Sequence, residues 1–336
     1  MERIEALKSL LSSPKDIVIV SHRNPDGDAV GSSLGLFHFL NHFGHVVHIV
    51  FPSEYPDFLS WMPSVDHIIS YDEQQDQAKT VISEASLIFC LDFNGLDRID
   101  KVGEFIMDNP APKVLIDHHL DPEPFADFVL SDTKASSTAE LVYDFIHLLN
   151  WESFLDQNVG SCIYTGIITD TGSFKFGTSA KLFRVVADLV ERGIQDQALQ
   201  DLIANNLSEK HLRLLGYCLF HRMEILEEFR TGIITLAKED YARFDIQRGD
   251  TEGIVNYLLR MPKIVLAVFI TEQPTVVKLS LRSKGDFSVQ EIAVQHFKGG
   301  GHRNASGGAS FIGLRPTVRK FKELLPMYKE KLDTAL

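Results

Sequence analysis

Cysteine is scarce in this chain of 336 residues, which limits the chemistry that thiols can provide. The three cysteines, Cys90, Cys162 and Cys218, each lie inside an apolar segment, and none has CxxC or other metal-type spacing. This pattern argues against a disulfide framework and a thiolate zinc site, and it indicates buried thiols in a reducing compartment. We therefore expect a cytoplasmic protein.

Long apolar runs are also missing. The longest, residues 264–270, is far short of the roughly 20 residues that a membrane-spanning helix needs. The N-terminal MERIEALKSLL places Ile4, Leu7 and Leu11 at helical spacing among charged residues, without the uninterrupted apolar region of a signal peptide. We expect neither a membrane partner nor a secretion signal.

Positive charge is in deficit, because 33 lysines and arginines face 46 aspartates and glutamates, for a formal net charge of -13. A protein that follows long nucleic acid needs a broad basic surface. The composition therefore argues against long duplex nucleic acid as a partner. A small anionic substrate drawn to a local cationic site is compatible with it, and so is a homodimer.

The first half of the chain alternates short apolar segments with helical patterns, which is typical of a doubly wound parallel sheet in an α/β fold. The expected strands are residues 16–21, 46–51, 86–91 and 113–116. The expected helices are residues 29–43, 96–107, 137–149, 155–168 and 179–192.

The length favours two domains, and the pattern changes along the chain. We expect a catalytic metal-binding domain at 1–192, a helical connector at 193–228 and a smaller α+β substrate-binding domain at 229–336. The last domain shows strand patterns at 231–236, 264–270 and 275–282, and a helix at 289–297. A glycine-dense turn at 299–301, a small-residue strand and a closing helix from Thr317 follow.

Six residues that can bind divalent metals occur in four separate blocks, SHRNPDGDAVGS, LIFCLDFN, VLIDHH and TGIITDTGSF. They are His22, Asp26, Asp28, Asp92, His118 and Asp170. Oxygen and imidazole ligands without a thiolate favour Mn²⁺ or Mg²⁺ over structural zinc. Ligands of open α/β sheets bind beyond the carboxyl ends of the strands, where all but one of these blocks lie.

Each block alone has an ordinary explanation, since an acidic residue after a strand often only caps the next helix. Four blocks that converge in one fold are harder to dismiss. One shared carboxylate and three groups per ion suffice for two divalent metals and a bridging hydroxide. The chain is thus predicted to be a metal-dependent hydrolase.

Taken together, the motifs resemble the DHH phosphoesterase superfamily, specifically members with a DHH-associated C-terminal domain. They are HxxxDxD at His22 to Asp28, the isolated Asp92, Asp117-His118-His119, the DTG at Asp170 to Gly172, and the GGGH at Gly299 to His302. They occur in the expected order over nearly the whole chain.

The resemblance implies a site with two Mn²⁺ ions, with Mg²⁺ or Co²⁺ as alternatives. It puts His22 and Asp26 on one ion, and Asp28, His118 and Asp170 on the other. Asp92 would bridge both ions. Asp117 would orient the cluster, and His119 would contact the scissile phosphate or assist the leaving group.

The segment GGGHRNASGG can be interpreted without the family. Consecutive glycines let backbone N–H groups approach an anion, although a tight turn between helix and strand explains them as well. The resemblance assigns the substrate's phosphate or terminal nucleotide to Gly300, Gly301, His302, Arg303 and Asn304, together with Arg282. Ser136 and Ser137 also resemble a family motif near the site, although helix capping alone explains at least one of them.

We therefore expect a phosphoesterase that hydrolyses short oligoribonucleotides or adenosine 3',5'-bisphosphate by attack of a metal-bridging hydroxide. Cyclic-dinucleotide or linear-dinucleotide phosphodiesterases are the nearest alternative, followed by exopolyphosphatase. A nucleotide-sensing module with a dead site is disfavoured because all six ligands and His119 are present. Lys175 and Phe176 depart from the arginine and tyrosine common in relatives, which leaves the choice of substrate open.

Overall fold

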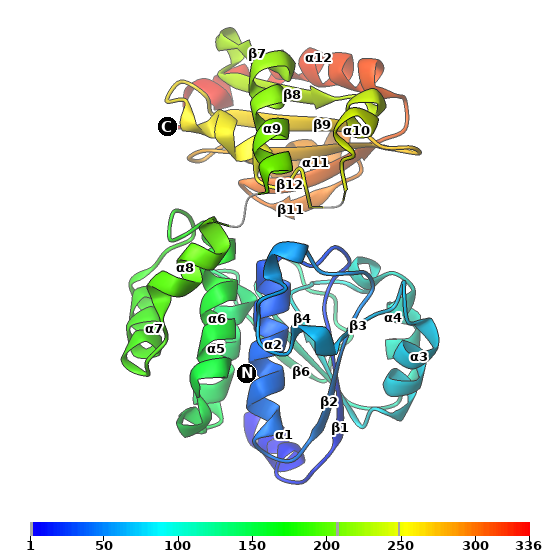
Figure 1. Cartoon of the computed structure of the whole chain (residues 1–336), viewed down its shortest axis with the longest axis vertical. Coiled ribbons are helices and arrows are strands. Elements are labelled where there is room, and N and C mark those ends of the chain that lie inside the picture. The colour runs from blue at the N-terminus through cyan, green and yellow to red at the C-terminus, as the bar shows by residue number, and fades with distance from the viewer. Residues whose placement is uncertain (1–2, 206–207, 248) are drawn as a thin grey trace. The chain divides into compact units, whose positions relative to one another are not determined.

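The computed structural model describes residues 3–205, 208–247 and 249–336, and the chain forms two compact units, Met1–Asn206 and Leu207–Leu336 (Figure 1). The boundary falls inside the segment 193–228 that the sequence predicts as a connector. That segment contributes α8 (Asp196–Ala204) to the first unit and α9 (Glu209–Tyr217) to the second. The exact limits of the predicted domains stay a prediction.

The first unit is built on a six-stranded sheet in which every neighbouring pair is parallel. Its order is β3-β2-β1-β4-β5-β6, so the direction of winding reverses between β1 and β4. The strands are β1 (Asp16–Val20), β2 (Val46–Phe51), β3 (Ile68–Ser70), β4 (Leu87–Leu91), β5 (Lys113–Asp117) and β6 (Phe128–Ser131).

Helices cover both faces of this sheet because alternate residues of its central strands are apolar on opposite sides. In β1, Ile17 and Ile19 belong to one core, and Val18 and Val20 belong to the other. The first core includes α1 (Ile4–Leu11), α2 (Gly27–Asn41), α5 (Thr138–Leu148), α6 (Gln157–Asp170) and α7 (Ala180–Glu191). The second includes α3 (Gln75–Glu84) and α4 (Lys101–Asp108). The predicted doubly wound α/β fold is confirmed (Figure 1).

One predicted helix, at residues 96–107, is wrong as a single element. A 3-10 turn, Leu96–Ile99, precedes α4, and Asp100 between them has a left-handed φ of 48°. The carboxylate of Asp100 pairs with the guanidinium of Arg23, which also binds Asp72 at 2.8 Å. This ion-pair network lies at the break in the helix. It also holds Arg23, the residue that follows His22.

The second unit contains a mixed six-stranded sheet of order β11-β12-β10-β9-β8-β7, in which only β8 and β9 among the described pairs are parallel. Its strands are β7 (Met223–Leu226), β8 (Thr231–Leu236), β9 (Leu266–Glu272), β10 (Val277–Ser283), β11 (Gly300–His302) and β12 (Ala305–Ser310). The helices are α9, α10 (Lys238–Phe244), α11 (Val289–His296) and α12 (Leu314–Asp333). Strand β7 was missed because its segment reads as helical.

The predicted glycine turn at residues 299–301 is wrong in its detail, because Gly300–His302 form the edge strand β11. A Cβ at Gly299 would lie 1.9 Å from the carbonyl oxygen of Gly307, and one at Gly301 would lie 2.7 Å from that of Ala305. Two of the glycines are therefore required by the close approach of β12. Gly300 has open space around it.

Among the described residues, no helix has both the length and the apolar character needed to cross a membrane.

Candidate metal centre and active site

The predicted metal ligands of the first unit converge at the carboxyl end of its sheet, where the strand order reverses. His22 follows β1 by one residue, Asp92 follows β4 directly and His118 follows β5 directly. Helix α2 delivers Asp26 and Asp28 at its start, and helix α6 ends at Asp170. All six residues predicted from the sequence are brought together.

The first group of candidate ligands consists of His22, Asp26 and Asp92, each of which offers one nitrogen or oxygen atom within 4.8 Å of the others. His22 Nε2 is 3.4 Å from Asp92 Oδ2 and 4.0 Å from Asp26 Oδ1. On the other side of the ring, His22 Nδ1 is 2.9 Å from the carbonyl oxygen of Arg23. A hydrogen bond there leaves Nε2 as the acceptor, which is the tautomer that a metal ligand requires.

The second group consists of Asp28, Asp92 and His118, with Asp170 beside them. His118 Nε2 lies 3.8 Å from Asp28 Oδ2, 3.6 Å from Asp92 Oδ1 and 3.7 Å from Asp170 Oδ2. His118 Nδ1 is directed to the carbonyl oxygen of Ala135 at 3.4 Å. Both imidazoles therefore use Nδ1 for the backbone and direct Nε2 toward carboxylates.

Asp92 belongs to both groups, and each of its two carboxylate oxygens faces one of them. Oδ2 lies nearest His22 and Oδ1 lies nearest His118. The residue is almost fully buried, and its backbone has a left-handed φ of 64°. A non-glycine residue rarely adopts this conformation, and such residues cluster at functional sites.

The N-terminus of α5 holds two of these carboxylates in place. The backbone N–H groups of Thr138 and Ala139 donate to the two oxygens of Asp28 at 2.6 and 2.9 Å, and the Thr138 hydroxyl donates to Asp92 Oδ1 at 2.9 Å. A helix N-terminus favours negative charge there. Sequence reasoning missed Thr138, although the capping pattern Ser137-Thr138-Ala139-Glu140 was the available signal.

Gly166 on α6 makes room for this arrangement. A Cβ at that position would lie 2.6 Å from the Cβ of Ala139 and 3.0 Å from Asp28 Oδ1. A side chain at residue 166 would therefore press on both α5 and the Asp28 carboxylate. The absence of a side chain lets α2, α5 and α6 meet closely behind the ligands.

The carboxylates of the second group repel one another in a buried environment. Burial, reinforced by the charges of Asp92 and Asp170, raises the pKa of Asp28 well above its ordinary value. Burial also raises the pKa of Asp170. Burial would raise the pKa of Asp92 as well, but the hydrogen bond to His22 and the nearby imidazoles lower it instead. A divalent cation would offset both burial and repulsion, so the donor set fits such an ion.

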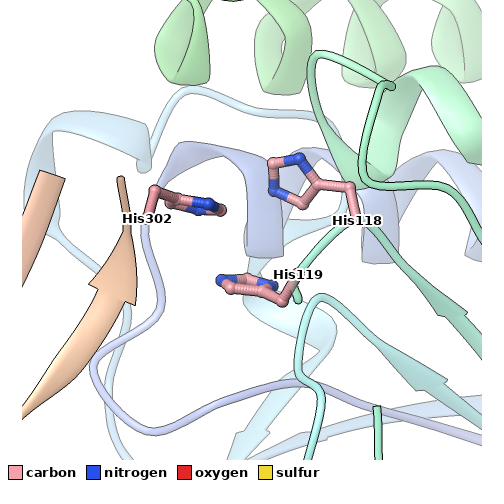
Figure 2. Close-up of side chains that lie close together, drawn as sticks. All are labelled: His118, His119 and His302. Atoms are coloured by element: carbon pink, nitrogen blue, oxygen red, sulfur yellow. The ribbon is translucent and has the colours of Figure 1, made fainter. Parts of the chain in front are cut away.

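Asp117 and His119 form a separate pair beside the ligands. Asp117 is fully buried, and its Oδ1 lies 2.7 Å from His119 Nδ1. Burial disfavours the charged imidazole, yet the hydrogen bond to Asp117 and the charge of Asp92 outweigh it and raise the pKa of His119. The imidazoles of His118 and His119 extend from the same loop (Figure 2). Their ring planes meet at 72°.

Ser137, which the sequence offers as a substrate contact, is fully buried and acts as the N-cap of α5, where its hydroxyl accepts the N–H of Glu140 at 3.1 Å. Its structural role is therefore to start the helix that carries Thr138.

The predicted substrate residues of the second unit lie on and around β10 and β11. Arg303 is exposed, and its Nη2 donates to the carbonyl oxygen of Asp286 at 2.6 Å and lies 3.2 Å from the Asp286 carboxylate. The amide of Asn304 donates to Ser283 and to the carbonyl oxygens of Gly285 and Phe287, so this side chain holds the turn after β10. His302 and Arg282 are partly exposed.

Comparisons with known proteins agree with this architecture. Residues 16–167 match the model of the DHH family, N-terminal domain, and residues 232–330 match that of the DHHA1 domain. The chain is 30% identical over 322 residues to the bifunctional oligoribonuclease and PAP phosphatase NrnA of Thermus thermophilus, covering 95% of this chain and 91% of that protein.

Two further proteins are similar to this chain over nearly its whole length. The crystal structure of an exopolyphosphatase-related protein from Bacteroides fragilis superposes with a TM-score of 0.94 at 39% identity, over 98% of this chain and 97% of that one. The cyclic-di-AMP phosphodiesterase GdpP of Bacillus subtilis is 24% identical over 97% of this chain, which spans 50% of that protein's length. With the relative at 30% identity and both domain matches, the chain belongs to the DHH family of phosphoesterases and carries a DHHA1 domain.

Proposed function

We propose that this protein hydrolyses short oligoribonucleotides and adenosine 3',5'-bisphosphate at a centre of two Mn²⁺ ions, for which Mg²⁺ or Co²⁺ could substitute. The observation that carries the proposal is the position of Asp92, whose two oxygens each serve a different histidine. A carboxylate placed in this way is suited to bridge two ions. The similarity to an oligoribonuclease and PAP phosphatase over nearly the whole chain supports the substrate class.

The ligands divide into two sets. His22 and Asp26 would hold one ion, whereas Asp28, His118 and Asp170 would hold the other, with Asp92 common to both. Oxygen and imidazole donors suit Mn²⁺. When bound, the two ions would lower the pKa of an attacking water and neutralise charge on the phosphate oxygens.

His119 and Asp117 would manage the proton of the leaving group. The hydrogen bond between Asp117 Oδ1 and His119 Nδ1 fixes the ring and favours a proton on Nδ1. In the imidazolium form, which the raised pKa of His119 favours, the opposite nitrogen Nε2 also carries a proton and would donate it to the leaving oxygen; in the neutral form Nε2 would only contact the phosphate. General acid catalysis of this kind typically contributes about 10²- to 10⁴-fold in rate.

The DHHA1 domain would recognise the substrate's phosphate or terminal nucleotide through Arg282, Gly300, His302 and Arg303. The pair between Arg303 and Asp286 is exposed, and such pairs are worth about 0–1 kcal/mol. An anionic substrate would therefore displace Asp286 from Arg303 at low cost. Asn304 would act indirectly, by holding the turn after β10.

A matched panel of substrates tests the proposal. With Mn²⁺, we expect turnover of adenosine 3',5'-bisphosphate and of RNA of two to five nucleotides, and weaker turnover of cyclic di-AMP and short polyphosphate. Asp92→Asn should abolish turnover, whereas Asp97→Asn, a change at an exposed carboxylate, should not. A preference for cyclic di-AMP or polyphosphate would overturn the substrate assignment. Tight nucleotide binding without turnover of any phosphate ester would favour a sensing module.

A further inference from the structure

We propose that the turn of residues 171–177 presents Phe176 as a stacking platform for a nucleobase of the substrate. The inference rests on the proposed function and deepens it, because it names the part of the substrate that this side of the site recognises. The ring would bind the base and thereby distinguish nucleotides from phosphate compounds that lack one.

Hydrogen bonds hold this turn in a defined conformation directly after Asp170. The carbonyl oxygen of Thr171 accepts the N–H groups of Lys175 and Phe176 at 2.9 and 3.0 Å, and the Thr171 hydroxyl accepts that of Phe174 at 3.0 Å. Gly172, Ser173, Phe174 and Gly177 all have φ between 57° and 64°. Glycine adopts this conformation freely, but Ser173 and Phe174 do not, which indicates that the surroundings hold the turn in this shape.

The two phenylalanines of the turn have different environments. Phe174 is partly buried and packs against Tyr164 and Phe183, with ring centroids 6.2 and 5.8 Å apart, so it anchors the turn to the helices below. Phe176 is 55% exposed. Its ring lies over Gly172, where an added Cβ would be 3.3 Å from Phe176 Cδ2. The ring is thus in contact with the backbone at Gly172, and more than half of its residue's surface is exposed.

The turn that carries Phe176 begins directly after the candidate ligand Asp170. Gly172, under the ring, is two residues from Asp170. At the other end of the turn, a Cβ on Gly177 would lie 3.9 Å from the Cα of Ser136, directly before the helix N-terminus that holds Asp28 and Asp92. A base stacked on Phe176 would therefore belong to a nucleotide whose phosphate reaches the ligands.

Lys175 supplies a charge suited to the same ligand. It is an exposed lysine directly before Phe176 in the sequence. An ammonium group next to an exposed ring is the combination that binds a base together with its phosphate, because stacking tolerates any base and the charge attracts the phosphate. We expect Lys175 to strengthen the binding of all phosphorylated substrates, and Phe176 to strengthen the binding only of those that carry a base.

The test compares adenosine 3',5'-bisphosphate with ribose 3',5'-bisphosphate, which has the same phosphates and no base. Phe176→Ala should raise the KM of the adenosine compound about 5- to 150-fold and leave that of the abasic compound within about twofold. Phe176→Tyr should restore the adenosine KM. Phe220→Ala, which removes a ring that is 83% exposed elsewhere, is the matched control and should change neither.

A binding measurement gives a readout without turnover. The fluorescence of 2-aminopurine riboside 3',5'-bisphosphate should be quenched on binding to the native protein and to Phe176→Tyr, and much less on binding to Phe176→Ala. Equal changes in KM for both bisphosphates, or equal quenching by Phe176→Ala, would overturn this inference and leave the proposed function standing. Hydrolysis of the abasic compound by a native protein that hydrolyses no nucleotide would overturn both.

Discussion

Replacing Thr138 with valine should weaken metal binding without unfolding the protein. The side chain is fully buried, and its hydroxyl donates to Asp92 Oδ1, the oxygen nearest His118. Valine has nearly the same shape and keeps the backbone N–H that binds Asp28. The substitution therefore removes one hydrogen bond to the shared carboxylate and little else.

The size of the effect follows from that hydrogen bond. A hydrogen bond to a charged group contributes about 1.5–3 kcal/mol, which corresponds to about 10- to 150-fold in affinity. We expect the Mn²⁺ site on the His118 side to lose most of this affinity, because Asp92 Oδ1 faces that side. The ion held by His22 and Asp26 should lose less.

Isothermal titration of the metal-free protein with Mn²⁺ measures both affinities. Thr138→Ser keeps the hydroxyl and should bind both ions within a few-fold of the native protein. Two unchanged affinities in Thr138→Val would refute the idea that α5 positions the shared carboxylate. Equal losses in the serine and valine variants would show that packing, and not the hydroxyl, is responsible.

Three further outcomes are expected. Gly166→Ala should cost about 1–3 kcal/mol of unfolding free energy and weaken Mn²⁺ binding. Adding Ala139→Gly should restore the stability measured in denaturant titrations. It should not restore the Mn²⁺ affinity, because the added methyl group still presses on Asp28. Arg303→Ala should raise the KM for short RNA while titrated Mn²⁺ affinity stays native, and lost metal binding would show the residue is misassigned. For each bound ion, Mn²⁺ at 100 times its dissociation constant should stabilise the protein by about 2.7 kcal/mol against thermal unfolding, an effect absent in Asp92→Asn.

Much of the site was predictable because histidine and aspartate residues after apolar strands indicate metal binding. His22, Asp92 and His118 follow apolar strands, and parallel strands in an open sheet place such residues at one edge. Thr138 was not predictable as a ligand partner, since a threonine after a capping serine has an ordinary explanation. Its contact with Asp92 depends on the packing of α5 against distant segments, which one sequence does not reveal.

The fold shows the same division between local and distant causes. The central strands were found from their apolar runs, whereas β3 and β6, with three and four residues, are too short for a recognisable pattern. The helix predicted at 96–107 breaks at Asp100, where a pair with the distant Arg23 accompanies the left-handed backbone. The sequence predicts a turn at Gly299 and Gly301, but both positions require glycine because β12 approaches them closely.

Anomalous diffraction from crystals grown with Mn²⁺ would locate the ions around Asp92. We predict two anomalous peaks about 3.5–4 Å apart, one beside His22 and Asp26 and the other beside His118 and Asp170, with an oxygen of Asp92 toward each. A single peak, or two peaks without an oxygen of Asp92 toward each, would show that Asp92 does not bridge two ions.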